Sequence, residues 1–162
     1  MHYHNITKDD MLNGEGLRVV LWVAGCSHCC KECHNPSTWD PNGGIYFDQS
    51  AKDEIWEGLK KSYIHGITFS GGDPLHGNNS LQVKELAREI KEQFPDKTIW
   101  LYTGSVWEGM KEMDIIPYLD VVVDGEFECK KKDENLHWKG SSNQRVIDVK
   151  ESLKSGTVVL YA

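Results

Sequence analysis

The chain has 162 residues, of which 39% are hydrophobic and 27% are charged. This balance is that of one ordinary globular domain and disfavours disordered or fibrous chains. The formal net charge of −7 argues against a surface that coats nucleic acid, since phosphate binding needs clustered Lys and Arg. No apolar stretch reaches the ~20 residues that span a bilayer, and Met1–Asp10 lacks the apolar core of a signal peptide. We expect a single cytoplasmic domain over residues 1–162, with no nucleic-acid or membrane partner.

Four short apolar runs predict the strands of this domain. They are, in chain order, Arg18–Ala24, Gly66–Ser70, Thr98–Tyr102 and Leu119–Val123. The near-continuous hydrophobicity of the first run is typical of a strand covered on both faces. Each run leads into a segment that contains glycine and residues able to bear chemistry.

Three segments between these runs predict helices. Ser50–Ser62 carries apolar residues on one stripe, with a possible capping box from its first residue to Asp53. Ser80–Phe94 has the clearest helical spacing, with its first residue as the expected N-cap. Val106–Met113 predicts a shorter helix. Strands and helices that alternate in this way imply an α/β fold with a parallel sheet.

In a parallel sheet the carboxyl ends of the strands emerge at the same edge, where active sites gather. We therefore expect Cys26, Gly71, Thr103 and Asp124, which follow or end the predicted strands, to converge on one cavity.

The chain beyond Glu126 has a less regular pattern. Trp138–Arg145 is loop-like, whereas Val146–Val149 and Thr157–Tyr161 could form edge strands. The topology of this part stays open.

Four of the five cysteines crowd into residues 26–33. A disulfide framework is disfavoured, because the cytoplasm keeps thiols reduced. Cys26, Cys30 and Cys33 have a C-x3-C-x2-C spacing, which lets three thiolates surround one small inorganic centre. A 4Fe-4S cluster normally takes four protein thiolates, so three would leave one iron open to bind and activate a small molecule.

The spacing leaves two alternatives to this ligand set. Cys29 could replace Cys30 as the middle ligand. Three cysteines together with His28 or His34 could instead hold a structural zinc ion. Cys129 lies in a distant charged stretch, and we assign it no role.

The cysteine loop after the first predicted strand resembles that of the radical SAM superfamily, whose members cleave S-adenosylmethionine (SAM) at a 4Fe-4S cluster. Six further segments narrow the resemblance to the activating proteins of anaerobic (class III) ribonucleoside-triphosphate reductases. These segments are Asn13–Gly16 (NGEG), Asn35–Trp39 (NPSTW), Ser70–Leu75 (SGGDPL), Ile99–Gly104 (IWLYTG), Val121–Phe127 (VVVDGEF) and Trp138–Arg145 (WKGSSNQR). The cysteine motif alone indicates the superfamily, whereas the ordered set on so short a chain indicates the family.

This resemblance implies a small partial (β/α) barrel with parallel strands, of the radical SAM type, as a single domain. It also implies one 4Fe-4S cluster on Cys26, Cys30 and Cys33, with SAM chelating the open iron. One electron would cleave SAM to a 5′-deoxyadenosyl radical, which would take a hydrogen atom from a glycine of the reductase large subunit. The electron donor would be a protein such as flavodoxin.

The resemblance assigns the loop after the second strand to the methionyl group of SAM. Gly71 and Gly72 would let the backbone approach the ligand and offer hydrogen bonds, although a tight turn would use the same glycines. Asp73 is a supporting residue, and with Pro74 it has the pattern of an N-cap followed by a first helical residue. Trp39 is interpreted as a core or interface anchor, since large aromatic residues contribute mainly buried area.

The other strand ends are assigned to the rest of SAM. Thr103 and Asp124 would bind the methionyl carboxylate or the ribose hydroxyls, or else shape the turns before the following glycines. The backbone of Glu32, Cys33 and His34 would run beside the adenine. Two residues depart from the family pattern, which commonly has a small residue in place of Glu32 and an aromatic such as Tyr in place of His34. The His34 ring could stack as that aromatic does.

Three other functions stay open. The chain could activate another glycyl radical enzyme, act on a small molecule as the deazapurine carboxylate synthases do, or be a non-catalytic zinc-binding interaction module. The segment WKGSSNQR argues against the small-molecule enzyme, and the other matching segments argue against the zinc module.

Overall fold

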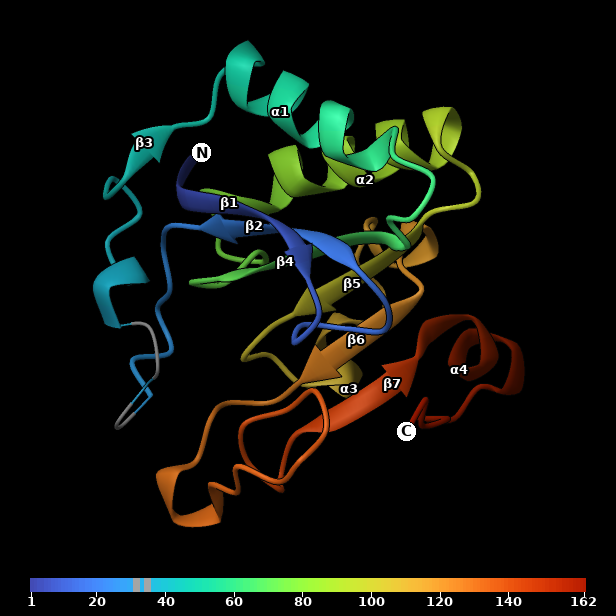
Figure 1. The fold of residues 1–162 in the computed structure, drawn as a ribbon. Coiled ribbons are helices and arrows are strands. Elements are labelled where there is room, and N and C mark those ends of the chain that lie inside the picture. Colours follow the sequence, from blue (N-terminus) through green and yellow to red (C-terminus); the bar gives the residue numbers. More distant parts are fainter. Residues whose placement is uncertain (31–32, 34–35) are drawn as a thin grey trace.

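The computed structural model describes residues 1–30, 33 and 36–162 (Figure 1). Within this part of the chain, one seven-stranded sheet has the strand order β3-β1-β2-β4-β5-β6-β7. The strands are β1 (His2–Asp10), β2 (Arg18–Val23), β3 (Ile45–Tyr46), β4 (Gly66–Gly71), β5 (Thr98–Tyr102), β6 (Val121–Asp124) and β7 (Arg145–Asp148). The helices are α1 (Gln49–Leu59), α2 (Ser80–Gln93), α3 (Trp107–Met110) and α4 (Val149–Ser155), with 3-10 turns at η1 (Pro36–Thr38), η2 (Ile116–Tyr118) and η3 (Cys129–Lys131).

The centre of the sheet is parallel. Strands β2, β4, β5 and β6 pair in parallel in that order, and they are the four strands that the apolar runs predict. Antiparallel strands flank them, with β1 and β3 on one side and β7 on the other. The predicted α/β class with a parallel sheet is therefore confirmed.

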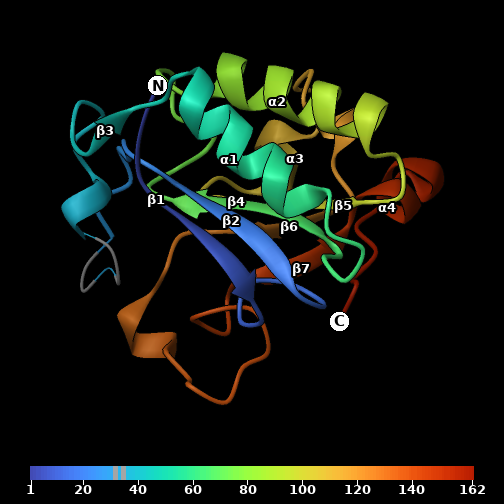
Figure 2. The same ribbon diagram turned by 45° about the horizontal axis from the view of Figure 1, so that its top comes forward.

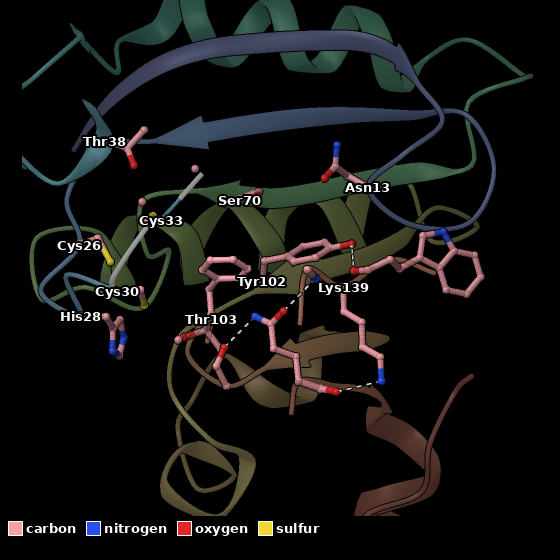
Figure 3. A pocket seen from close by; sticks show the side chains of 18 of the residues that line it. Asn13, Cys26, His28, Cys30, Cys33, Thr38, Ser70, Tyr102, Thr103 and Lys139 are labelled. Carbon is pink, nitrogen blue, oxygen red and sulfur yellow. Dashed lines mark hydrogen bonds between the residues drawn. The ribbon is translucent and has the colours of Figure 1, made fainter. Parts of the chain in front are cut away.

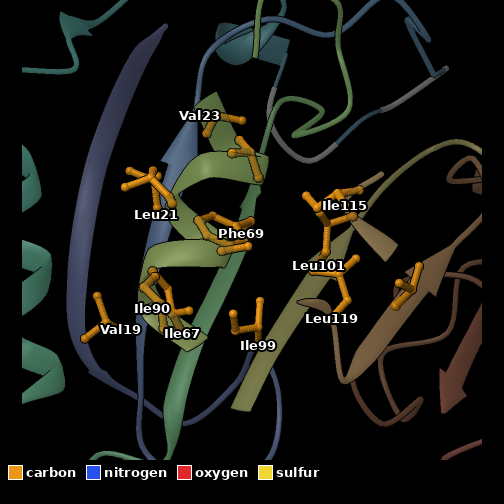
Figure 4. Packing of buried hydrophobic residues seen from close by; sticks show 14 of the residues in the cluster. Val19, Leu21, Val23, Ile67, Phe69, Ile90, Ile99, Leu101, Ile115 and Leu119 are labelled. Carbon is orange, nitrogen blue, oxygen red and sulfur yellow. The ribbon is translucent and has the colours of Figure 1, made fainter. Parts of the chain in front are cut away.

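The two faces of the parallel strands have different neighbours. Leu21, Phe69 and Leu101 lie in one register row and are fully buried in the main core, which also contains the apolar residues of α1 and α2 (Figure 4). Figure 2 shows α1 and α2 side by side on one face of the sheet. Because successive side chains of a strand point to opposite faces, Ser70 and Tyr102 point to the other face. That face carries the candidate site.

The helix starts differ from the predicted ones. Helix α1 is capped by Asp48, which accepts a hydrogen bond from the Ala51 N–H at 2.9 Å, so the predicted capping box from Ser50 is wrong. Helix α2 has Asn79 at its N-cap instead of Ser80, and the Asn79 side chain bonds the Ala24 carbonyl rather than the helix. The predicted third helix shortens to the four residues of α3.

The structure also contains elements that the apolar runs do not predict. Strands β1 and β3 and helix α4 are new, whereas β7 confirms one of the two expected edge strands. The other, Thr157–Tyr161, contributes a single bridge between Leu160 and Ile147. Among the described residues, no helix has the length and apolar character needed to cross a membrane.

Candidate functional site

A cavity of about 590 Å³ lies at the carboxyl ends of β2, β4 and β5, on the face of the sheet away from α1 and α2 (Figure 3). Ser70 and Tyr102 form its floor, and the loops that follow the three strands form one end. The structure thus brings three of the predicted strand-end residues, Cys26, Gly71 and Thr103, to one cavity.

The cysteine loop forms one end of this cavity. Cys26, Cys30 and Cys33 all line it, and the Cys33 N–H donates to the Cys30 carbonyl at 3.1 Å. Cys29 is exposed, has a left-handed φ of 50° and is not part of the described cavity wall. Of the two possible middle ligands, Cys30 lies on the described cavity wall and Cys29 does not. No three described His, Cys, Asp or Glu side chains already surround a metal-ion position.

The surroundings of Cys26 and Cys30 favour the protonated form of these two thiols. Burial raises the pKa of Cys26. Burial, together with the charge of Glu126, raises the pKa of Cys30 to about 11. The Cys30 thiol lies 3.7 Å from the Glu126 carboxylate. A bound metal ion stabilises thiolates, so it would offset this preference of Cys26 and Cys30.

A second set of contacts joins the loops after β2, β4 and β5. His28 Nε2 lies 2.6 Å from Asp73 Oδ2, and this contact raises the pKa of His28. The Thr103 hydroxyl donates to Asp73 at 2.9 Å, and the Gly104 N–H donates to it at 3.2 Å. The predicted N-cap role of Asp73 is wrong, because α2 begins only at Ser80 and the Asp73 carboxylate instead accepts from the Leu75 N–H.

The two glycines after β4 lie against the end of β2. A Cβ at Gly71, whose φ is +98°, would lie 2.6 Å from the Val23 backbone, and one at Gly72 would lie 2.5 Å from the Gly25 carbonyl. The Gly72 N–H already donates to Val23 and the Asp73 N–H to Gly25. The backbone packing therefore requires these glycines. Both glycines line the cavity, and the Gly72 and Asp73 N–H groups are already bonded within the chain.

Asp124 does not lie on the described cavity wall. Its carboxylate is buried and accepts from the Trp107 N–H at 2.8 Å, at the start of α3. It also pairs with Arg145 at 2.6 Å, and Arg145 in turn reaches Glu108. The sheet register places Asp124 directly opposite Arg145. The structure thus directs this carboxylate to α3 and β7 rather than to the residues gathered at the cavity.

The loop between β6 and β7 forms the far wall of the cavity. The Gln144 side chain organises it by accepting from the Gly140 and Ser141 N–H groups and donating to the Gly125 carbonyl. The Tyr102 hydroxyl joins this loop to β5 by donating to the Trp138 carbonyl at 2.6 Å. The sequence motifs assign neither Tyr102 nor Gln144 to the site, although Gln144 belongs to the WKGSSNQR segment.

Trp39 also lines the cavity. Its indole Nε1 is buried and has no hydrogen-bond partner in the described part of the chain. The sequence predicts only an anchor role for Trp39. Glu32 and His34, the other predicted adenine contacts beside Cys33, lie outside the described residues.

Comparison with known proteins identifies the family. A family model described as a 4Fe-4S single cluster domain matches residues 12–147. An anaerobic ribonucleoside-triphosphate reductase-activating protein of Enterobacteria phage T4 is 42% identical, over 90% of this chain and 93% of its own length. Proteins of the same name from Vibrio cholerae serotype O1 and Escherichia coli K12 are 41% and 40% identical, over 89% and 90% of this chain and 96% and 97% of their own lengths.

The chain belongs to the family of anaerobic ribonucleoside-triphosphate reductase-activating proteins. The resemblance stated from the sequence motifs is thereby confirmed. The residues matched by the 4Fe-4S domain model begin at Leu12 and end at Ile147. They enclose every described residue that lines the cavity, from Leu12 to Gln144. In this activating-protein family member, the 4Fe-4S domain and the cavity occupy the same part of the chain.

Proposed function

We propose that this protein activates an anaerobic ribonucleoside-triphosphate reductase by generating a glycyl radical on it, with a 4Fe-4S cluster and SAM as cofactors. The observation that carries the proposal is the position of Cys26, Cys30 and Cys33 on the wall of one cavity, in a chain that matches a 4Fe-4S domain and the reductase-activating proteins. In this proposal the parallel sheet is the partial (β/α) barrel of a radical SAM enzyme.

The described residues fit such a cluster. Three cysteines would hold it, which leaves one of its four irons without a protein ligand. The rest of the cavity leaves room for a ligand beside it. When bound, the reduced cluster supplies the electron that cleaves SAM to a 5′-deoxyadenosyl radical, which takes a hydrogen atom from the reductase glycine.

The chain's own groups would bind and orient SAM. The Gly71 and Gly72 carbonyls would accept hydrogen bonds from the methionyl amino group, with Asp73 holding the loop from behind. Thr103, which lines the cavity, would face the methionyl carboxylate or the ribose. By resemblance, the backbone of Glu32, Cys33 and His34 would run along the adenine. We assign Asp124 to support of α3, on the strength of its contacts with Trp107 and Arg145.

The partner in this proposal is the large subunit of the reductase. The names of this chain's relatives include that reductase. A glycine in a macromolecular substrate must reach the cavity from outside. The proposed electron donor is a small redox protein such as flavodoxin, and the proposed compartment is the cytoplasm.

An anaerobic reconstitution tests the proposal. The chain is loaded with iron and sulfide, reduced with dithionite and mixed with SAM and the anaerobic reductase. We expect 5′-deoxyadenosine and a glycyl radical doublet in the electron paramagnetic resonance (EPR) spectrum, both lost in Cys30→Ala. Bound zinc without 5′-deoxyadenosine would favour the interaction module. 5′-Deoxyadenosine without a doublet would favour a small-molecule substrate or another glycyl radical enzyme.

A further inference from the structure

The His28 side chain connects the loop that contains Cys26 and Cys30 to the loops that follow β4 and β5. In the sequence His28 stands midway between Cys26 and Cys30, and its Nε2 lies 2.6 Å from Asp73 Oδ2. Asp73 accepts in turn from Thr103 and from the Gly104 N–H. The Asp73 carboxylate therefore joins three loops, since His28 is 45 residues before it in the sequence and Gly104 is 31 residues after it.

The contacts of the His28 ring leave it little freedom. A carboxylate accepts hydrogen bonds, so Nε2 carries the proton that points to Asp73. The other nitrogen, Nδ1, faces Glu126 at 3.8 Å. The ring packs directly on Gly104, where an added Cβ would lie 2.6 Å from it. Figure 3 shows His28 beside Cys30 and close to Thr103 at the cysteine end of the cavity.

Asp73 stands behind the cavity wall. Its side chain is 4% exposed and is not among the described groups that line the cavity, whereas His28, Gly72 and Thr103 are. A charged hydrogen bond at such a buried site fixes relative positions strongly. The network therefore fixes the distance between the cysteine loop and the parts of the cavity wall that contain Gly72 and Thr103.

We propose that His28 is a positioning residue that acts through Asp73 to hold the cysteine loop in register with the walls that bind SAM. This inference rests on the proposed function. It assigns His28 to SAM affinity rather than to cluster ligation. It also explains why glycine follows Thr103, since a side chain at Gly104 would displace the ring.

Binding of SAM to the reconstituted, unreduced protein tests this inference without turnover. Radiolabelled SAM is titrated anaerobically, and iron and sulfide are counted for each variant. We expect His28→Phe, which keeps a ring but loses the donor, to retain full iron and to raise the SAM dissociation constant about tenfold. His28→Gln, whose amide nitrogen can reach the Nε2 position, should return the constant to within about threefold of the wild-type value.

A double-mutant cycle with Asp73→Asn separates positioning from direct contact. If His28 acts through Asp73, His28→Phe costs little further affinity in the Asp73→Asn background. An equal loss in both backgrounds would mean that His28 touches SAM itself and would overturn the inference, as would loss of iron from His28→Phe. Wild-type affinity in His28→Phe would overturn it and leave the proposed function standing. A loaded wild-type protein that binds no SAM would overturn both.

Discussion

At each end of strands β2, β4 and β5, a buried charged residue links the three strands or their loops through hydrogen bonds. We call these two sets of bonds the amino-end tie and the carboxyl-end tie, and they differ in function. At the amino ends, Arg18 donates five hydrogen bonds of 2.9 Å to Thr68, Thr98 and the carbonyls of Glu15, Ile67 and Thr98. At the carboxyl ends, the Asp73 carboxylate collects the loops through His28, Thr103 and Gly104.

The difference lies in what each tie leaves exposed to a ligand. Arg18 is fully buried, burial lowers its pKa to about 10, and its five N–H groups all end on acceptors of the chain. His28 and Thr103 both also face the cavity. The amino-end tie is therefore expected to serve stability alone, whereas the carboxyl-end tie serves the geometry of a binding site.

Arg18→Met gives the largest expected effect on stability. The substitution leaves buried hydroxyl and carbonyl groups without their donor, so we expect the free energy of unfolding to fall by about 3 kcal/mol. Urea unfolding of the metal-free chain measures it. His28→Phe is the matched change at the other end and should cost under about 1 kcal/mol, because His28 is partly exposed. A larger loss in His28→Phe than in Arg18→Met would reverse the comparison.

Gly72→Ala tests the close packing of the carboxyl-end loops. Its Cβ would meet the Gly25 and Thr38 carbonyls at 2.5 and 2.8 Å, so the backbone must shift and we expect a loss of about 2 kcal/mol. Gly77→Ala is the control, because nothing lies within 4 Å of its Cβ, and its effect should stay within about 0.5 kcal/mol. Equal unfolding curves for the two variants would show that the loop yields to the added methyl group.

Asp124→Asn is expected to have a smaller effect than Arg18→Met and Gly72→Ala. The amide still accepts from Trp107 but weakens the pair with Arg145, so we expect a loss of about 1 kcal/mol in urea unfolding. The SAM dissociation constant should not change, because the carboxylate does not lie on the described cavity wall. A clear loss of SAM affinity at unchanged stability would return Asp124 to the ligand contacts that the sequence predicts.

The central strands could be predicted because strands that are buried on both faces have continuous apolar sequences. Val19, Leu21, Phe69 and Leu101 are fully buried, and their segments read as apolar runs. Strand β1 could not be found in this way, since HYHNITKDD is mostly polar and only Ile6 within it is buried. Its position comes from pairing with β2, which periodicity does not show.

The same distinction applies to the site. The strand-end rule brings Cys26, Gly71 and Thr103 to one cavity without any knowledge of side-chain contacts. It does not predict the bond from His28 to Asp73, because that bond depends on the conformations of two loops. It also could not foresee that Asp124 pairs with Arg145, since this follows from the antiparallel register of β7 on β6.

The central claim is that Cys26, Cys30 and Cys33 hold a cluster with one iron open to SAM. Iron content and the EPR spectrum of the reduced protein, recorded with and without SAM, test it most directly in the wild type, Cys29→Ala and Cys30→Ala. We predict that the wild type and Cys29→Ala bind a cluster whose signal changes on addition of SAM, and that Cys30→Ala binds none. A cluster retained in Cys30→Ala but lost in Cys29→Ala, or a wild-type signal indifferent to SAM, would contradict the claim.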